Sequence, residues 1–156
     1  MVNPKLEGRK AMSIAYIEHK GAYGEVPWEE YMHRLYGWAK EQKVMPGFFP
    51  MSICYDNPAE VAPSQCRSDI AISFKGKAKG TQGIKTRDLP AMKVVSYSHK
   101  GPANEYANSY AKMGAWIEEK GYKPSGAPIE VYSKKPEVVK GVTILYAKIM
   151  IPVKKK

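Results

Sequence analysis

The sequence lacks the features that mark several common protein classes. No run of apolar residues is long enough to cross a bilayer, and the first residues, Met1 to Lys5, do not form the apolar core of a secretion signal. The two cysteines, Cys54 and Cys66, are not spaced as a redox or metal-binding pair, so we expect reduced structural thiols. These absences predict a cytoplasmic protein that does not bind a membrane.

Motifs of catalysis and cofactor binding are also missing. There is no nucleophile elbow, phosphate-binding loop or dinucleotide-binding glycine pattern, and Cys54 has no identifiable base. His19 and His99 have no third ligand at a suitable spacing, so a metal site is not expected. We therefore expect no metal, no cofactor and no catalytic residue that the sequence by itself identifies.

Acidic residues are outnumbered, and the net charge is +10, but the excess is concentrated in two places. The first place holds Lys75, Lys77 and Lys79, and the second is the end of the chain, Lys154 to Lys156. Without these six lysines the net charge is +4, and no helix-turn-helix pattern or basic stripe with interleaved aromatic residues accompanies them. Direct binding to nucleic acid is therefore not expected.

The clearest positive feature is an internal duplication. Matching residues recur at offsets of 78 to 80: His19-Lys20-Gly21 with His99-Lys100-Gly101, Ala11-Met12 with Ala91-Met92, and Trp38 with Trp116. Two similar halves in one small chain commonly pack face to face, and ligand pockets concentrate at such interfaces. We therefore expect a binding cleft between the halves.

Each half predicts the order strand, helix, strand, strand. Strands are predicted over residues 10–18, 49–55, 67–74, 92–98, 129–132 and 142–153. Helices are predicted over 27–43 and 104–120, where apolar residues recur at the spacing of one helix face.

This order predicts a single α+β domain over residues 1–156. The repeats are expected at about 10–74 and 84–153, with a linker rich in glycine and lysine at 75–83. Antiparallel pairing of six strands, with both helices on one face, is the architecture that this order favours.

A charged residue stands in the middle of the last predicted strand of each half, Asp69 in the first and Lys148 in the second. Because side chains alternate along a strand, Tyr146, Lys148 and Met150 share one face. The two charges could be satisfied structural charges, or they could act as ligand counter-ions in an apolar cavity, because burying an unpaired charge is costly. The residues by themselves leave both interpretations open.

The two predicted helices carry large side chains on one face: Tyr31, Trp38, Tyr106, Tyr110, Met113 and Trp116. Such a face is most often ordinary core against a sheet. Tyrosine, however, needs a partner for its hydroxyl. The alternative is that some of these rings line a cavity and stack on a planar ligand.

Five segments resemble the GyrI-like small-molecule-binding domain. They are Tyr55–Glu60, Cys66–Ile70, Leu35–Trp38, His99–Pro102 and Gly121–Tyr132. The likeness runs from about residue 10 to residue 153 and implies the duplicated βαββ fold. It also implies an effector-binding module of multidrug-responsive transcription activators, or a stand-alone gyrase-inhibiting or toxin-protecting protein. Some stand-alone members are similar to hydrolases of cyclopropane-containing alkylating natural products. Because only a short tail precedes residue 10, we expect a stand-alone protein.

The resemblance implies a central glutamate on the last strand, which neutralises cationic aromatic ligands in drug-binding members. This sequence has Lys148 at that place. We therefore hypothesise that the cleft binds a small neutral or anionic planar molecule, with Lys148 as counter-charge, Asp69 as its resting partner and aromatic rings as walls. In the alternative of a hydrolase, Glu130 or Asp69 would have to act as general base. A third alternative is interaction with a protein such as DNA gyrase.

Overall fold

The computed structural model describes residues 3–156, which contain ten strands and two α-helices. The strand pairings are antiparallel, so the protein has the α+β class that the sequence predicts. The chain divides into two compact units, one formed by Lys10–Ala91 and the other by the residues up to Arg9 together with Met92–Lys156. Across the described residues, no helix combines the length and the apolar character needed to cross a membrane.

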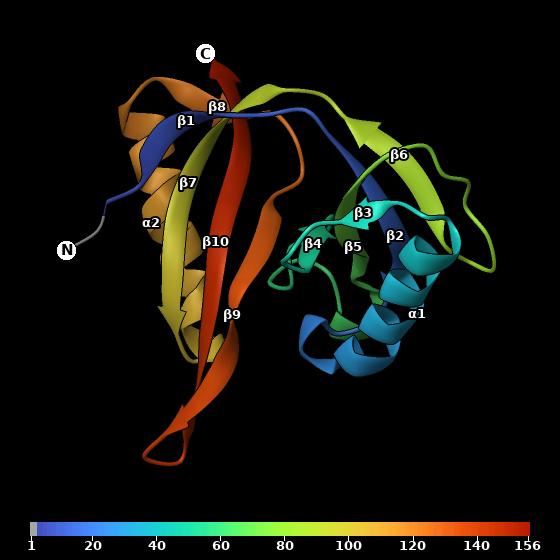
Figure 1. Ribbon diagram of the computed structural model, residues 1–156. Helices are drawn as coiled ribbons and strands as arrows, with labels where there is room; N and C mark the ends of the chain where they lie inside the picture. The colour runs from blue at the N-terminus through green and yellow to red at the C-terminus, as the bar shows by residue number, and fades with distance from the viewer. Residues whose placement is uncertain (1–2) are drawn as a thin grey trace. The chain divides into compact units, whose positions relative to one another are not determined.

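The unit formed by residues 10–91 is a sheet with helix α1 (Trp28–Glu41) on one face (Figure 1). Its strands in sheet order are β4 (Met51–Cys54), β5 (Arg67–Lys75), β2 (Met12–Lys20) and β6 (Lys85–Leu89), with the short β3 (Met45–Pro46) also paired to β5. Two single 3-10 turns, η1 (Tyr23–Glu25) and η2 (Pro63–Gln65), lie in its loops. We call this unit A.

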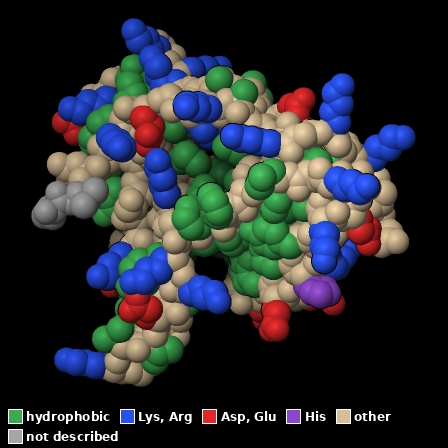
Figure 2. Space-filling model, in the orientation of Figure 1, with side chains coloured by type: hydrophobic (Ala, Val, Ile, Leu, Met, Phe, Trp, Pro, Cys, Tyr) green, Lys and Arg blue, Asp and Glu red, His purple; other side chains and the backbone are tan. Residues whose placement is uncertain are grey.

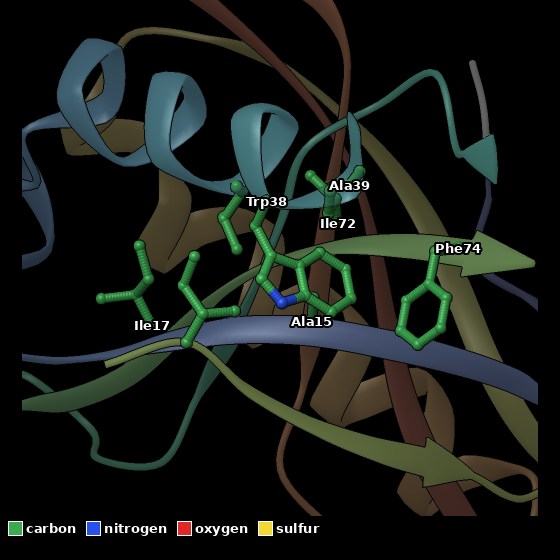
Figure 3. Packing of buried hydrophobic residues seen from close by; sticks show 8 residues of the cluster. Ala15, Ile17, Trp38, Ala39, Ile72 and Phe74 are labelled. Carbon is green, nitrogen blue, oxygen red and sulfur yellow. The ribbon is translucent and has the colours of Figure 1, made fainter. Parts of the chain in front are cut away.

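The core of unit A lies between α1 and the sheet (Figure 3). The indole of Trp38 packs edge-on against Phe74, with ring centroids 5.2 Å apart. Its Nε1 donates a hydrogen bond of 2.8 Å to the carbonyl of Lys79, so the predicted linker is fixed to the helix. The remaining buried members of this cluster are Ala15, Ile17, Leu35, Ala39, Ile72 and Ile84.

The second unit, which we call unit B, is also a sheet with one helix, α2 (Tyr106–Glu119), on one face (Figure 1). Its strands in sheet order are β1 (Lys5–Arg9), β7 (Met92–Gly101), β10 (Val142–Lys155) and β9 (Ile129–Val139), and β8 (Tyr122–Pro124) pairs with the end of β10. The turn η3 (Ala103–Glu105) leads into the helix. The core beneath α2 is formed by Val95, Met113, Ile117, Ile149, Ile151 and Val153.

The sequence missed four strands, and two of them change the division of the chain. β1 and β6 are short and charged, so they carry no apolar alternation. β6 pairs with β2 in unit A, although the sequence places residues 84–91 in the second repeat. β1 pairs with β7 in unit B, although it precedes the first repeat. The units therefore exchange their first strands, and the boundary falls after Ala91 instead of within 75–83.

The hairpin of β9 and β10 is longer than the sequence predicts. β9 continues to Val139, where 129–132 was expected, and the turn at Lys140 and Gly141 has positive φ angles of 50° and 78°. Two consecutive residues with positive φ match the twist of antiparallel strands, which explains a tight two-residue connection. The hairpin extends past the end of α2 (Figure 1).

Candidate functional site

Lys148 lies on the face of β10 that points away from helix α2. Its neighbours Ile149 and Ile151 pack beneath the helix, and alternation places Lys148 on the opposite face. Its ammonium lies 3.2 Å from Oε2 of Glu7 on β1. Ser96 on β7, between these strands, donates a hydrogen bond to the same oxygen. This hydrogen bond and the nearby Lys148 lower the pKa of Glu7, so its carboxylate is ionised at neutral pH.

Asp69 on β5 occupies the corresponding place in unit A, on the face away from α1, and is only 4% exposed. The guanidinium of Arg87 on β6 lies 2.9 Å from its Oδ2, and Tyr55 donates a hydrogen bond of 2.5 Å to the same oxygen. Arg87 also donates to the Tyr55 hydroxyl at 2.7 Å and lies 4.6 Å from the centre of the Tyr16 ring. Burial and the bond to Asp69 raise the pKa of Tyr55 to about 12, so the phenol stays a protonated donor.

The two ion pairs are counterparts with reversed signs. Glu7 and Arg87 stand 80 residues apart at the same register position of their edge strands. Each bonds to a central-strand charge, which is Lys148 in unit B and Asp69 in unit A. The sequence led us to expect Asp69 as the resting partner of Lys148. Each charge instead has a partner on the edge strand of its own unit, because exchange of the first strands brings that partner in.

Tyr146 and Met150 share the Lys148 face, but their surroundings differ. Met150 is buried, with 7% of its surface exposed. The Tyr146 ring lies below two ammonium groups, that of Lys134 at 4.7 Å and that of Lys100 at 5.9 Å from the ring centre. Tyr146 is half-buried, so it offers an aromatic surface beside two ammonium groups, of which that of Lys134 is paired with the carboxylate of Glu137.

Glu130 lies on β9 with its side chain beneath helix α2. Its Oε2 accepts a hydrogen bond of 2.5 Å from Tyr110 on the helix, and its Oε1 accepts one of 2.8 Å from Tyr132 on the same strand. The side chain is 9% exposed. Both oxygens of this buried side chain therefore have hydrogen-bond donors, as buried polar groups require.

The large helix residues divide between core and polar contacts. Trp38 and Met113 are 2% and 0% exposed and pack as ordinary core beneath α1 and α2. Trp116 is partly buried beside the core of unit B, with the Lys120 ammonium 5.7 Å from its ring centre. The Tyr31 hydroxyl lies 3.1 Å from Nδ1 of His19, near the end of β2.

The histidines at the two repeated strand ends both contact helix residues. Nδ1 of His19 is the partner of Tyr31, and Nδ1 of His99 lies 2.7 Å from Oγ of Ser109. The His99 ring also stacks on Tyr106 at a centroid distance of 4.0 Å. Within residues 3–156, no group of three His, Cys, Asp or Glu side chains is arranged to hold a metal ion.

Two open hollows lie on unit A. One, of about 360 Å³, is lined by strand residues and the lysine-rich loop, among them Ser13, Lys77 and Arg87. The other, of about 600 Å³, lies beside the start of α1 and is lined by Trp28 and His33, among others. Neither hollow is lined by a residue that the sequence predicted to bind ligand. Figure 2 shows Lys and Arg side chains spread over the visible face instead of gathered in one stripe.

Sequence reasoning missed the partners of the candidate charges, namely Glu7, Ser96, Arg87, Tyr55 and Tyr132. Partners of this kind come from distant strands, and no local pattern marks them. The 80-residue offset also relates Lys5–Arg9 to Lys85–Leu89, but these two segments share only their first lysine. The sequence therefore gives no usable signal for Glu7 and Arg87, and the relation becomes visible only through the strand register.

A family model described as the GyrI-like small molecule binding domain matches residues 3–154. No curated protein sequence matches the chain. A crystal structure of the EcmrR C-terminal domain has a TM-score of 0.81 at 16% identity, covering 99% of this chain and 98% of that one. EcmrR in a cryo-EM complex with DNA gives a TM-score of 0.78 at 16% identity. That match covers 99% of this chain and 58% of EcmrR, so this chain spans little more than half of that relative.

Two further solved structures have the same fold. A hydrolase encoded by lin2189 from Listeria innocua has a TM-score of 0.72 at 13% identity, with 97% of this chain and 92% of that chain covered. SAV2435, solved with bound tetraphenylphosphonium, has a TM-score of 0.58 at 12% identity, with 98% and 94% covered. At these identities the likeness establishes the fold.

Proposed function

Because the chain belongs to the GyrI-like small-molecule-binding domain family, we propose that it binds a small, flat, mainly apolar molecule that is neutral or negatively charged. The observation that carries this proposal is the ion pair of Lys148 and Glu7 on the face of β10 that points away from α2. A relative, SAV2435, has been solved with a lipophilic cation. Here a cation beside Lys148 would meet an ammonium group, and like charges repel.

The exposure of the pair supports exchange of its acidic member for a ligand group. The side chain of Lys148 is 42% exposed and that of Glu7 is 28% exposed. Because the two charges cancel, a neutral ligand meets no unpaired charge. A ligand carboxylate that takes the place of the Glu7 carboxylate keeps the ammonium paired, whereas a ligand cation must compete with Lys148 for Glu7.

Tyr146, two residues before Lys148 on the same face, supplies an aromatic surface for a flat ligand. Aromatic rings attract planar molecules by stacking, and the Lys100 ammonium lies 5.9 Å from the centre of this ring. The Lys134 ammonium on the same ring is paired with the Glu137 carboxylate. The charge of Lys100 therefore favours ligands with a negative group at their edge.

Calorimetric titration with matched aromatic ligands tests the proposal. Three naphthalene derivatives that differ only in one substituent, a carboxylate, its methyl ester and a trimethylammonium group, separate charge from shape. We expect the carboxylate and the ester to bind more tightly than the ammonium compound. Lys148→Met is expected to weaken the carboxylate about tenfold, as loss of a charge-assisted contact does, and to leave the ester nearly unchanged.

Lys154→Met is the matched control, because Lys154 is an exposed lysine near the end of the same strand. Glu7→Gln is expected to strengthen carboxylate binding, since it removes the competing carboxylate. Tighter binding of the ammonium compound would contradict the proposal, as would carboxylate binding that is equally affected by Lys148→Met and Lys154→Met.

A hydrolase is a second candidate because unit B holds a buried carboxylate between two phenols. Glu130 would act as general base only after releasing Tyr110 or Tyr132, since both carboxylate oxygens accept hydrogen bonds. Turnover of a cyclopropane-containing alkylating compound that is abolished by Glu130→Gln, with unfolding stability retained, would favour this candidate. Asp69 is less suited, because its Oδ2 already accepts from Tyr55 and Arg87.

We further propose that the protein acts in the cytoplasm. Within the described residues no disulfide joins Cys54 and Cys66, which fits a reducing compartment. Binding to a protein such as DNA gyrase stays a prediction. Co-purification of that protein with the unaltered chain and with the Lys148→Met variant tests it.

A further inference from the structure

We infer that Glu7 and Arg87 disfavour the unexchanged arrangement, in which β1 and β6 would each form a hairpin with the strand that follows it, and so favour the entry of β1 into unit B and of β6 into unit A. The two edge strands are equivalent in register, since each pairs with the start of its neighbour at positions 80 residues apart. Each could therefore occupy the place of the other. Something in the sequence must select the observed arrangement.

The unexchanged arrangement has suitable spacing. Only Lys10 and Ala11 separate β1 from β2. In unit A, Leu89 lies opposite Met12. If β1 replaced β6, Arg9 would lie opposite Met12, which is the closing pair of a two-residue hairpin. Such a hairpin joins neighbouring segments and would form faster than the observed long-range pairing.

Turn chemistry opposes these local hairpins. Two-residue hairpin turns require a positive φ at their first position, which glycine and asparagine supply. The available pairs are Lys10-Ala11 and Pro90-Ala91, and the ring of Pro90 fixes φ at a negative value. None of these four residues has positive φ in the structure. The connections thus favour a chain that continues straight into the next strand.

The charges of Glu7 and Arg87 are a second factor that disfavours the local hairpins. In the place of Arg87, the carboxylate of Glu7 would face the carboxylate of Asp69 and the electron-rich face of Tyr16. In the place of Glu7, the guanidinium of Arg87 would face the ammonium of Lys148. Each wrong placement removes an ion pair and creates a like-charge contact, which is how specificity is built against an alternative.

Apolar contacts agree with the charges. Leu6 packs against the core of unit B, and the residue at the same register position of β6 is Thr86, which has less apolar surface. Ile84, just before β6, is 6% exposed in the core of unit A. Exchange therefore places the larger apolar side chains where each core receives them.

Disulfide trapping in the full chain reads the arrangement directly. Gly8 lies opposite Lys93, so Gly8→Cys with Lys93→Cys reports the exchanged arrangement. In a local hairpin Gly8 would take the register of Asp88 and lie opposite Ser13, so Gly8→Cys with Ser13→Cys reports that arrangement. A Cβ at Gly8 meets nothing within 4 Å. Peptide mapping by mass spectrometry distinguishes these bonds from any bond to Cys54 or Cys66.

In the otherwise unaltered chain we expect the 8–93 bond to form under mild oxidation and the 8–13 bond not to form. Reversal of both edge charges, Glu7→Arg with Arg87→Glu, is expected to lower the folded-to-unfolded ratio at least about tenfold and to reduce the yield of the 8–93 bond. Adding Lys148→Glu and Asp69→Arg restores opposite charges and is expected to recover both measurements. The neutral control, Glu7→Gln with Arg87→Gln, creates no like-charge contact and leaves the connections unsuited to hairpins, so it is expected to keep the 8–93 bond.

Formation of the 8–13 bond in the chain without charge reversal would overturn the inference. A double reversal that behaves like the neutral control in stability and in trapping would also overturn it. If the double reversal does not fold, the four-residue variant decides: recovery of folding supports the charge rule, and failure to recover overturns it.

Discussion

Tyr110 on helix α2 donates a hydrogen bond of 2.5 Å to Oε2 of Glu130 on strand β9, and this bond ties the helix to the sheet of unit B through a buried carboxylate. Hydrogen bonds to charged groups contribute more than neutral ones because the acceptor attracts the proton more strongly. Helix position in unit B therefore depends on a polar contact as well as on the apolar core.

Tyr110→Phe is expected to lower the free energy of unfolding by about 2 kcal/mol, because it leaves one oxygen of a buried carboxylate without this donor. Urea denaturation measures the change. Tyr97→Phe is the control. The Tyr97 ring centre lies 5.2 Å from the Lys112 ammonium, and phenylalanine keeps this ring. We expect its free energy of unfolding to change by no more than about 0.5 kcal/mol. Equal losses in the two variants would contradict this assignment.

Glu7 makes a contribution to stability that depends on pH. Its folded-state pKa lies below the ordinary value of 4.5, chiefly because Ser96 donates to the carboxylate. The contribution is present above pH 4.5 and is lost as the pH falls through the folded-state pKa, where both states become protonated. We expect Glu7→Gln to be less stable than the unaltered chain at pH 7 and the difference to shrink below pH 4.5. A difference that is constant down to pH 2 would refute this linkage.

Met113 is fully buried beneath α2, so Met113→Ala removes apolar contacts and leaves a cavity. We expect a loss of about 2 to 5 kcal/mol in the free energy of unfolding. Met45 provides a matched control because the same substitution there affects a side chain that is 70% exposed, with an expected change within about 0.5 kcal/mol. Both are measured by thermal and urea unfolding, and similar losses at the two sites would rule out the core assignment.

Two glycines are expected to respond to alanine with opposite signs. Gly114 lies within α2, and a Cβ there meets nothing within 4 Å, so Gly114→Ala should stabilise the protein by about 0.5 to 1 kcal/mol. At Gly80 a Cβ would lie 2.4 Å from the backbone oxygen of Ile84, so Gly80→Ala should destabilise it by about 1 kcal/mol or more. Unfolding midpoints of the two variants on the same side of the unaltered chain would contradict this difference.

Much of the fold is encoded in local patterns. The helix spacing in 27–43 and 104–120 locates α1 and α2 to within a few residues, and the six strands with apolar alternation are all present. β1, β3, β6 and β8 could not be predicted, since each has at most five residues and little apolar character. Such strands form because they pair with a neighbouring strand of the sheet, and that strand lies far away in the sequence.

For the candidate site, the sequence proposed the central charges Asp69 and Lys148, Glu130 and the aromatic helix faces, and the structure shows that Glu130 is buried. It could not separate Trp38 and Met113, which are core, from Tyr110, whose hydroxyl contacts a carboxylate. Periodicity shows which side chains share a face but not what lies opposite that face.

The sequence by itself determined that the chain is duplicated, that each half contains a helix over strands, and that a lysine stands in the last strand. These properties follow from repeats and periodicities that a single segment carries. Only the tertiary structure decided that Glu7 neutralises Lys148 and Arg87 neutralises Asp69. An ion pair depends on distances of a few ångströms between strands remote in sequence, and the exchange of first strands sets those distances.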